Sequence, residues 1–529
     1  MKKVLIANRG EIALRIVRAC RELGLQSVAV YSDADARAPH VREADEAVRL
    51  GPPPSAESYL RGDLIIEAAK QVGADAVHPG YGFLSEREWF ARAVRDAGLV
   101  WVGPPAEAIA AMGSKTAART LALAHDVPVV PGTTAALRDA AEAAEIAARF
   151  GYPVLLKAAA GGGGKGMRVV REASALASSL EAARREAQNA FGDDAVYVEK
   201  YIDGPRHVEI QVLADTHGRC VSLGERECSV QRRHQKMIEE APSVAVNAEL
   251  RRAMGAAAVR VAKAAGYQNA GTCEFLLAPD GQFYFLEMNT RIQVEHPVTE
   301  LVTGIDLVQW QLRIAAGERL PFTSHIDPRG WAMECRITSE DAANGFLPSA
   351  GRVSYLRLPG GPGVRWDGAI GVGSEISLFY DAMLAKLIVW APTRAEAIAR
   401  MHRALDELTI DGLETSREFH LRVMEDDEFR RGAIDIQWLE RRLDSLVGAP
   451  APREQVEAAA IAAALLAERD RLRRLPMAAG TANGATSRDS SARHGAPRDG
   501  AARDGIATGL LPEHQPWARL ARQQGLRGE

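Results

Sequence analysis

Short apolar runs alternate with helical patterns over the first hundred residues. Residues 4–7 and 27–31 are apolar runs of strand length, and between them apolar residues recur at the spacing of a helix. This alternation predicts a doubly wound α/β domain over residues 1–112. No GxGxxG motif follows the first strand, so the pattern does not favour a dinucleotide. A loop at residues 78–86 (HPGYGFLSE) follows a predicted strand, where α/β sheets tend to place ligands.

Strand patterns dominate residues 113–331, which we predict to be a second domain. Residues 152–157 and 167–170 are strand-like runs on either side of a glycine-rich loop at residues 161–166. Glycine lets backbone N–H groups approach a phosphate, while neighbouring lysines supply charge. The loop is not a Walker A motif, because a strand follows it and no Lys-Ser or Lys-Thr pair closes it. A flexible linker is the alternative, and the flanking strands argue against it.

The remaining residues fall into two parts of different character. Residues 332–447 have a β-rich α+β pattern that includes a helix over 394–408. An alanine- and arginine-rich helix is predicted over 454–475. Residues 477–508 consist largely of Ala, Gly, Arg, Asp and Ser without periodicity, which predicts disorder. We therefore expect residues 448–529 to be a helical and then low-complexity tail without chemistry.

Two glutamates on neighbouring predicted strands point to a metal site. Asp280 and Gly281 are a strong signal for a two-residue hairpin turn, which would place Glu274 directly opposite Glu287. Opposite residues have Cβ atoms about 4.5–5.5 Å apart, and two carboxylates at that distance favour a cation between them. Oxygen ligands suit Mg²⁺ or Mn²⁺. The sequence therefore predicts a divalent cation at this hairpin.

The second strand of the hairpin continues as a polar stripe. Because side chains alternate along a strand, one face would carry Glu287, Asn289, Arg291, Gln293 and Glu295. Arginine in that stripe suits a small anion. The opposite face would be apolar, with Tyr284, Leu286, Met288, Ile292 and Val294. A solvated edge hairpin is the alternative, and the chemical variety of the polar face argues against it.

Two charged segments carry weaker signals. Residues 196–202 form a strand pattern that includes Glu199 and Lys200, and such strands in ATP-binding folds present backbone groups to adenine. Residues 226–236 are dense with hydrogen-bond donors, and a solvated surface is the usual interpretation of such a run.

Composition narrows the class of protein without identifying it. The 529 residues are 47% hydrophobic and 25% charged, which is ordinary for soluble proteins with about three domains. A net charge of −4 gives no electrostatic reason to expect a nucleic acid or an anionic membrane as partner. The five cysteines form no CxxC pair, and the first apolar run is too short for a signal peptide or a membrane span. We therefore expect a reduced, cytoplasmic setting.

Taken together, these motifs resemble the biotin carboxylase family of ATP-grasp ligases. The resemblance runs from Lys3 to about Leu446, and its carriers are residues 6–13 (IANRGEIA), 78–86, 161–167 (GGGGKGM), 231–242 (QRRHQKMIEEAP) and 287–300 (EMNTRIQVEHPVTE). It implies an N-terminal doubly wound domain, a central ATP-grasp domain and a β-rich C-terminal domain. The departures are Ala159 and Ala160 before the glycine loop and a missing proline after Asp341.

The resemblance also implies roles for individual residues. ATP would be held by Lys115, Lys157, Gly163, Gly164, Glu199, Lys200, Tyr201, Ile202, His207, Gln231, His234, Glu274 and Glu287. Two Mg²⁺ or Mn²⁺ ions would be ligated by Glu274, Glu287 and Asn289. Bicarbonate and biotin would be held by Lys236, Arg291, Gln293, Val294, Glu295, Arg336 and Tyr81. Glu295 would be the base, and the catalytic set would be Lys236, Arg291, Glu295 and Arg336.

The implied reaction is ATP-dependent carboxylation of biotin with bicarbonate through carboxyphosphate. This is the first half-reaction of an acetyl-CoA or other acyl-CoA carboxylase, and it serves fatty acid biosynthesis. The implied partners are a biotin carboxyl carrier protein, a carboxyltransferase and a second copy in a homodimer. The alternatives are the front part of the alpha chain of a propionyl- or methylcrotonyl-type carboxylase, another ATP-grasp ligase that joins a carboxylate to an amine, and a non-catalytic ATP-grasp regulator. The sequence does not name the final acceptor.

Overall fold

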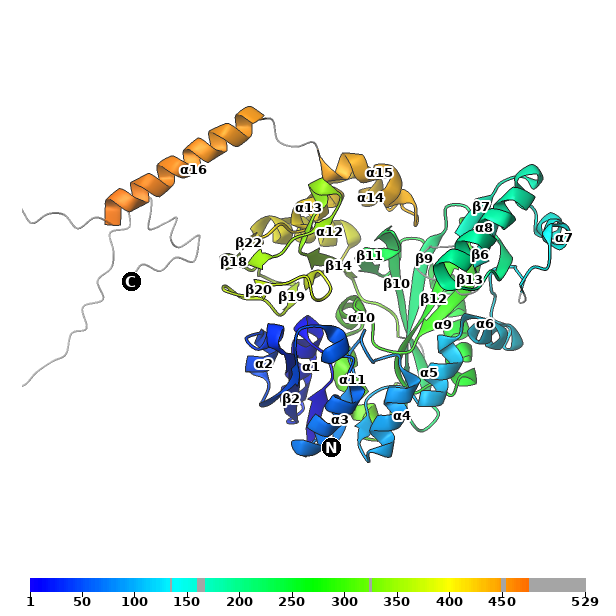
Figure 1. Cartoon of the computed structure of the whole chain (residues 1–529), viewed down its shortest axis with the longest axis horizontal. Coiled ribbons are helices and arrows are strands. Elements are labelled where there is room, and N and C mark those ends of the chain that lie inside the picture. The colour runs from blue at the N-terminus through cyan, green and yellow to red at the C-terminus, as the bar shows by residue number, and fades with distance from the viewer. Residues whose placement is uncertain (134–135, 159–166, 323–325, 449–452, 475–529) are drawn as a thin grey trace, which may run out of the picture. The chain divides into compact units, whose positions relative to one another are not determined.

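The computed structural model describes residues 1–133, 136–158, 167–322, 326–448 and 453–474. The chain divides into two compact units, residues 1–448 and residues 449–529. The first unit contains the sheets that carry the candidate site residues (Figure 1). Within the second unit, the described part is helix α16 (Arg453–Arg474), and the predicted low-complexity segment lies outside the described residues.

A five-stranded parallel sheet forms the beginning of the chain, as the sequence predicts. Its strand order β3-β2-β1-β4-β5 is that of a doubly wound sheet. The strands are β1 (Lys3–Ile6), β2 (Gln26–Ser32), β3 (Glu46–Gly51), β4 (Ala76–His78) and β5 (Val100–Trp101). The helices of this part are α1 (Gly10–Glu22), α2 (Pro39–Glu43), α3 (Gly62–Gln71), α4 (Glu88–Asp96), α5 (Ala106–Gly113) and α6 (Lys115–Ala124). Val4, Leu5 and Ile6 are fully buried, as expected for a strand covered on both faces.

A small antiparallel sheet with two helices follows. Its order is β7-β6-β8, with β6 (Val154–Ala158), β7 (Met167–Val170) and β8 (Val196–Lys200). Helices α7 (Ala140–Phe150) and α8 (Leu176–Phe191) pack on it around a modest apolar cluster that includes Leu156, Leu180 and Val198. Figure 1 shows this layer at the right-hand edge of the unit. The predicted glycine loop, with Gly163 and Gly164, lies outside the described residues.

An eight-stranded antiparallel sheet is the centre of the fold. Its order is β13-β12-β9-β10-β11-β14-β21-β19. The strands are β9 (Arg206–Ala214), β10 (Cys220–Arg232), β11 (Gln235–Ala241), β12 (Asn269–Leu277), β13 (Phe283–Asn289), β14 (Trp331–Thr338), β19 (Val364–Gly368) and β21 (Met383–Ala391). The associated helices are α9 (Ala248–Ala264), α10 (His296–Thr303), α11 (Leu307–Ala315) and α12 (Arg394–Glu407). Strands from both sides of the predicted boundary at 331/332 therefore share one sheet.

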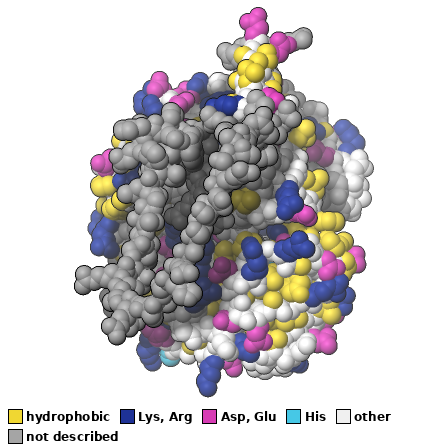
Figure 2. Space-filling view, turned by 90° about the vertical axis from the view of Figure 1, so that its left-hand side faces the viewer, with side chains coloured by type: hydrophobic (Ala, Val, Ile, Leu, Met, Phe, Trp, Pro, Cys, Tyr) yellow, Lys and Arg dark blue, Asp and Glu magenta, His cyan; other side chains and the backbone are white. Residues whose placement is uncertain are grey.

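The remaining elements complete the C-terminal part of the first unit. They are β15 (Glu340–Asp341), β16 (Leu347–Pro348), β17 (Gly351–Arg352), β18 (Tyr355–Arg357), β20 (Glu375–Ile376), β22 (Thr409–Asp411), α13 (Arg417–Glu425), α14 (Asp427–Arg431) and α15 (Trp438–Val447). Helix α12 starts with a capping box, in which Thr393 and Glu396 satisfy each other's backbone N–H groups. None of the helices in the described part combines the length and hydropathy needed to span a bilayer. On the visible part of one face, acidic and basic side chains are interspersed (Figure 2).

Candidate active site

The β12–β13 hairpin places Glu274 opposite Glu287, although by a different route from the predicted one. The loop is one residue longer than a two-residue turn, because Ala278 N–H donates to the carbonyl of Gln282 and Leu277 pairs with Phe283. A β-bulge between Glu274 and Phe275 then shifts the register by one residue. The two differences cancel, so the predicted Glu274–Glu287 pairing is present while the predicted turn is wrong.

The predicted apolar face of β13 is wrong in part, because the bulge changes which side chains face the core. Phe285 and Met288 are buried, whereas Tyr284 and Leu286 are part-exposed. Before the bulge the odd-numbered positions face the core, and after it the even-numbered position 288 does. Phe285 packs edge-to-face on Phe275 with ring centroids 5.9 Å apart, which fixes this side of the hairpin.

The polar stripe does not stay extended to its end. Strand β13 stops at Asn289, and Glu295 is the N-cap residue of α10. The chain between them nevertheless returns the polar side chains to one place. Arg291 Nη1 donates to Gln293 Oε1 at 2.9 Å, and Gln293 Nε2 donates to Glu274 Oε1 at 3.3 Å. The predicted stripe therefore converges through a turn and a helix start rather than along one strand.

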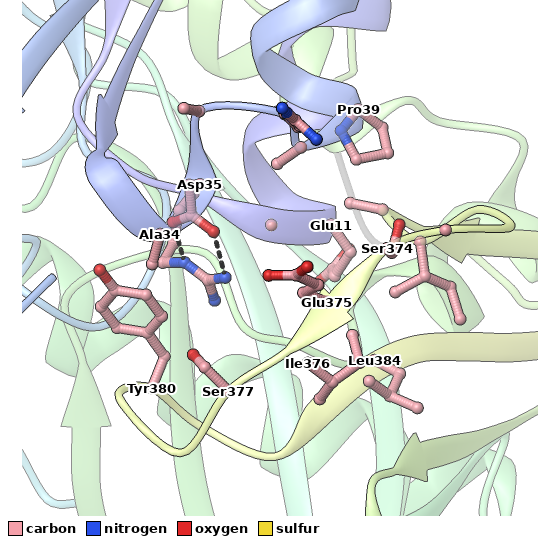
Figure 3. Close-up of a pocket in the computed structure, with 18 of the residues that line it drawn as sticks. Glu11, Ala34, Asp35, Pro39, Ser374, Glu375, Ile376, Ser377, Tyr380 and Leu384 are labelled. Carbon is pink, nitrogen blue, oxygen red and sulfur yellow. Dashed lines mark hydrogen bonds and ion pairs between the residues drawn. The ribbon is translucent and has the colours of Figure 1, made fainter. Parts of the chain in front are cut away.

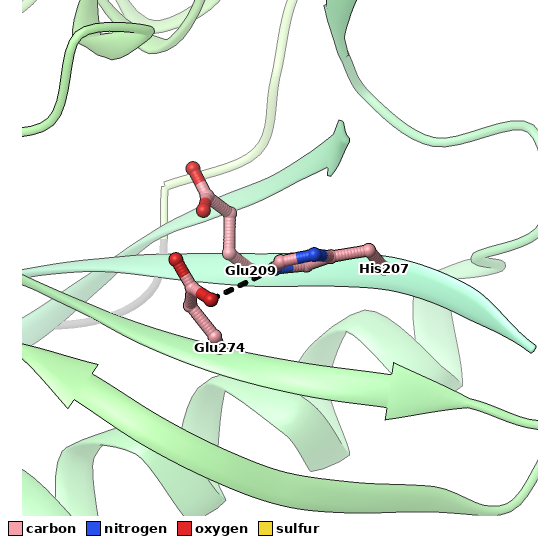
Figure 4. A group of neighbouring side chains, drawn as sticks. All are labelled: His207, Glu209 and Glu274. Atoms are coloured by element: carbon pink, nitrogen blue, oxygen red, sulfur yellow. Dashed lines mark ion pairs between the residues drawn. The ribbon is translucent and has the colours of Figure 1, made fainter. Parts of the chain in front are cut away.

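Lys236 on β11 is the centre of the cluster, which we call the Lys236 cluster. Its Nζ lies 2.5 Å from Glu209 Oε2, 2.9 Å from Glu274 Oε1 and 2.7 Å from Glu295 Oε1. These carboxylates come from β9, β12 and the start of α10, so the cluster ties three distant segments together. On β9, His207 lies beside Glu209, and its Nε2 is 3.0 Å from Glu274 Oε2 (Figure 4).

Burial and mutual charge set the protonation of this cluster. Burial alone would lower the pKa of Lys236, but the three carboxylates raise it well above its usual value. Burial alone would raise the pKa of Glu295, but Lys236 and Arg336 lower it well below its usual value. Lys236 is therefore a cation and Glu295 a carboxylate at neutral pH. A small anion can therefore replace one of the three carboxylates as the partner of the Lys236 cation, with the Glu295 carboxylate beside it.

Arg226, for which the sequence predicted no role, lies beneath the cluster and binds Glu209, one of the carboxylates that contact Lys236. The side chain is fully buried, and its guanidinium donates to Glu209 at 2.5 Å, Gln211 at 2.7 Å, Thr299 at 2.9 Å and Thr272 at 3.0 Å. The prediction of a solvated surface for residues 226–236 is wrong at this end of the segment. Glu209 could have been predicted as a site residue, because it alternates with His207 and Gln211 on one face of β9. No comparable pattern in the sequence points to Arg226.

Arg336 on β14 joins the cluster from the other side. Its guanidinium lies 2.6 Å from Glu239 Oε1 and 3.0 Å from Glu295 Oε2. Tyr81, in the loop after β4, donates its hydroxyl to Glu11. Lys386 donates to the carbonyl of Val294 at 2.9 Å and lies 3.2 Å from Glu11 Oε2. The backbone at Val294 is thus fixed by a lysine that the sequence did not single out.

The residues predicted to ligate a divalent cation, Glu274, Glu287 and Asn289, lie together on the β12–β13 hairpin. Asn289 Nδ2 donates to Glu274 Oε1 at 2.8 Å, and Glu287 is the cross-strand partner of Glu274. Partial burial and repulsion by the Glu274 carboxylate raise the pKa of Glu287. Among the described residues, Lys115 is the cation paired with Glu287, with its Nζ 3.9 Å from Glu287 Oε2. Glu274 is paired with Lys236 and His207, whereas Glu287 has the more distant Lys115, so the two carboxylates leave a place beside Glu287 that fits a hard divalent cation.

The other residues predicted to bind ATP are distributed over the small sheet and the β10–β11 hairpin. Lys157 Nζ lies 2.7 Å from Glu199 Oε2, and Lys200 Nζ donates to the carbonyl of Gly151 at 2.8 Å. Tyr201 accepts a hydrogen bond from Gln437, and Ile202 follows it as a half-buried residue. Gln231 is buried on β10, while His234 is exposed at the hairpin turn with φ +65°. The structure does not gather this second group as tightly as the Lys236 cluster.

A cavity of about 630 Å³ lies between the first sheet and the C-terminal part. Arg9 pairs with Asp35 on its wall, and the Arg9 guanidinium lies 4.1 Å from the ring centroid of Tyr380 (Figure 3). Glu11, the partner of Tyr81, also lines it. Tyr380 binds Ser32 Oγ at the end of β2 at 2.5 Å and the Pro53 carbonyl in the loop after β3 at 2.6 Å. The wall of this cavity therefore ties residues 369–384 to the N-terminal part.

Three sequence models of protein families match the chain. They are the biotin carboxylase N-terminal domain over residues 1–109, the ATP-binding domain of the carbamoyl-phosphate synthase L chain over residues 114–323, and the biotin carboxylase C-terminal domain over residues 334–441.

Known proteins match at high identity over most of the chain. A biotin carboxylase from Haemophilus influenzae is 53% identical over 445 residues, covering 84% of this chain and 99% of the relative. The propionyl-CoA carboxylase alpha chain from Ruegeria pomeroyi is 46% identical over 494 residues, covering 89% of this chain and 72% of the relative. A solved structure is that of the biotin carboxylase domain dimer of the Hydrogenobacter thermophilus 2-oxoglutarate carboxylase, in complex with MgADP, ADP and bicarbonate. It is 47% identical with a TM-score of 0.78, and the match covers 85% of this chain and 99% of that one.

Proposed function

The chain belongs to the biotin carboxylase family, and on that premise we propose that its Lys236 cluster is where biotin is carboxylated by bicarbonate in an ATP-dependent reaction. The single observation that carries this placement is the meeting of Lys236, Glu295 and Arg336 in a buried site. A base with two flanking cations is what bicarbonate needs, since the cations hold the anion while the base removes its proton.

The nucleotide end of the site would be formed by the residues around Glu287. Glu274, Glu287 and Asn289 would ligate Mg²⁺ or Mn²⁺, which neutralises charge on the phosphates when bound. Lys115 and Lys157 would bind the phosphates, and Glu199 to Ile202 would contact the adenine. His207 already pairs with Glu274 and would keep that carboxylate oriented. Support for this assignment comes from the solved relative that holds MgADP.

Bicarbonate would bind where Lys236, Arg291 and Gln293 meet. Glu295 then takes the proton of the bicarbonate hydroxyl, and the freed oxygen attacks the γ-phosphorus of ATP. The bond between that phosphorus and the β–γ bridging oxygen breaks, which gives carboxyphosphate and ADP. Lys236 and Arg336 lower the basicity of Glu295 while both contact it, so drawing them toward the bound anion makes Glu295 a stronger base.

Biotin would bind on the Arg336 and Tyr81 side. Carboxyphosphate breaks down to CO₂ and phosphate, and phosphate takes the proton from the ureido nitrogen. That nitrogen then attacks CO₂, while Arg336 stabilises the negative charge on the ureido oxygen. Glu239 holds Arg336 from below at 2.6 Å, so the guanidinium needs little reorganisation during the reaction.

The biotin would be carried by a separate protein. In this family biotin is attached to a lysine, usually within Ala-Met-Lys-Met, and none of the lysines of this sequence lies in that motif. The relatives named above include carboxylases with different acceptors, propionyl-CoA and 2-oxoglutarate. We therefore propose a carrier protein and a carboxyltransferase as partners, with the carboxyltransferase selecting the acceptor. A homodimer is proposed from the dimeric relative.

Coupling of ATP hydrolysis tests the proposed activity. Purified protein with free biotin should release ADP in a manner that depends on both bicarbonate and biotin. A rival ligase that joins a carboxylate to an amine would not need biotin, and a non-catalytic regulator would release no ADP. ADP release that is equal with and without biotin would contradict coupled carboxylation.

A blot tests the proposed carrier. Protein expressed with an active biotin ligase should give no streptavidin signal on this chain, while a co-purified carrier should give a separate band. A biotin adduct located on this chain by mass spectrometry would overturn the proposal of a separate carrier.

A further inference from the structure

Two buried glutamates, Glu239 and Glu334, face each other next to Arg336, and no ion pair joins a cation to Glu334 among the described residues. Glu239 on β11 and Glu334 on β14 are direct cross-strand partners in the antiparallel register. Both side chains are fully buried. Residues opposite each other in such a pair have Cβ atoms about 4.5–5.5 Å apart, and like charges there are destabilising. This pair therefore needs an explanation that the catalytic roles proposed above do not supply.

Three of the four oxygens of this pair have no hydrogen-bond partner in the part of the chain that the structure describes. They are Glu239 Oε2 and both carboxylate oxygens of Glu334. The fourth, Glu239 Oε1, accepts from Arg336 at 2.6 Å. An ionised carboxylate that is buried and unpartnered is among the most unfavourable arrangements in a protein interior. Glu334 is in that position unless it carries a proton.

The cations around Glu334 are already engaged. Lys386, on the neighbouring strand β21, binds the Val294 carbonyl and Glu11. Arg336, two residues along β14 on the same face, binds Glu239 and Glu295. The other ionisable groups that face Glu334 are Glu239, Glu295 and Tyr81. Burial is the main cause that raises the pKa of Glu334 well above its usual value; the Glu239 and Glu295 charges add to it, and the Lys386 and Arg336 charges oppose it without cancelling it.

We propose that the Glu239–Glu334 pair carries one proton at neutral pH and that this proton is on Glu334. The pair thereby positions Arg336 for the reaction. Ionised Glu239 holds the guanidinium from below. Neutral Glu334 keeps a second negative charge away from it, so Arg336 stays available to Glu295 and to the developing charge on biotin. The functional part of this inference rests on the proposed role of Arg336, whereas the proton on Glu334 does not.

Difference infrared spectroscopy tests the proton directly, without any substrate. Wild-type protein at neutral pH should show the carbonyl stretch of a protonated carboxyl group that is missing from Glu334→Gln. Glu225→Gln is the matched control, because Glu225 is equally buried but is bound by Arg251 through two hydrogen bonds of 2.7 Å. Glu225→Gln should leave that band unchanged. Identical spectra for wild type and Glu334→Gln would overturn the proposal, whether or not the enzyme carboxylates biotin.

The pH dependence of unfolding gives an independent readout. A carboxyl group whose pKa is raised on folding contributes stability below its usual pKa and loses that contribution as the pH rises through its folded pKa. The stability of wild type relative to Glu334→Gln should therefore fall as the pH rises from about 4.5. The alkaline decline of kcat should move to higher pH in Glu334→Gln, because glutamine cannot acquire a charge beneath Arg336. A stability difference that rises with pH would show that Glu334 is ionised in the folded protein and would contradict the proposal.

Discussion

The eight-stranded sheet and the small sheet both supply candidate site residues, but they hold them very differently. On the large sheet, Lys236 has side-chain exposure of 11%, and Glu295 beside it, at the start of α10, has none; each contacts two or more charged partners. In the small sheet, Lys157 is 29% exposed and has one charged partner among the described residues, Glu199. The small sheet is also supported by a modest apolar cluster of its own.

This difference separates the two tasks of the proposed reaction. The residues proposed to bind bicarbonate and biotin are fixed by buried ion pairs in the absence of substrate. Some of the residues proposed to bind ATP, Lys157 and Glu199 to Ile202, lie instead on or directly after the strands of the small sheet, a layer with fewer internal constraints at the edge of the unit (Figure 1). Such a layer can adjust to the nucleotide without disturbing the chemistry, because no residue of the small sheet is part of the Lys236 cluster.

Replacing the proposed base is expected to give the largest effect. Glu295→Gln should lower kcat by roughly 10²–10⁴-fold, the usual range for loss of a general base, with little change in ATP affinity. Glu287→Gln, at the nucleotide end, should instead weaken binding of the metal–nucleotide complex. Steady-state kinetics with varied MgATP and bicarbonate would separate the two. The same kinetic signature in both variants would contradict the division of roles along residues 287–295.

Removing the buried arginine beneath the cluster should come next, as a loss of stability. Arg226→Met leaves Glu209 with Lys236 as its remaining cation and leaves Gln211, Thr272 and Thr299 without their donor. Removing one partner of a buried ion pair lowers the free energy of unfolding by about 3–5 kcal/mol. Chemical denaturation followed by circular dichroism would measure this. Arg49→Met is a suitable control, because its pair with Asp33 is exposed on both sides.

The corresponding change in the small sheet should affect binding rather than stability. Lys157→Met should alter the free energy of unfolding by less than about 1 kcal/mol, since its pair with Glu199 is part-exposed. The KM for ATP should nevertheless rise by roughly 10- to 100-fold, the equivalent of losing about 1.5–3 kcal/mol from a charged hydrogen bond. A loss of stability as large as that of Arg226→Met would remove the contrast between the sheets.

Deletion of residues 449–529 should have the smallest effect. These residues form a separate unit, and none of the candidate site residues lies in them. The shortened protein should fold and should carboxylate free biotin at the rate of the full chain. A protein that unfolds at the same denaturant concentration as the full chain but lacks activity would show that the tail takes part in the reaction.

The sequence predicted the local features of the site better than its long-range ones. The pairing of Glu274 with Glu287 follows from alternation and a nearby turn, and it survived an error in the turn because the bulge compensated for it. Glu239 and Glu334 were missed, because each belongs to a strand whose alternation looks ordinary, and their meeting depends on the pairing of β11 with β14 across some ninety residues of chain. Arg226 was missed for the same reason, since its four partners lie on β9, β12 and α10.

The bulge in β12–β13 separates the length of the hairpin loop from the orientation of the residues beyond it. Residues 279–281 lie at an exposed hairpin end, where Gly281 adopts a φ of +85° and has open space around its α-carbon. The facing of Glu274 and Glu287 is set on the other side of the bulge, next to the packed Phe275. A peptide tag or a fluorescent reporter inserted between Asp280 and Gly281 would therefore leave the two carboxylates in register, which makes this loop a site for labelling the enzyme close to its nucleotide end.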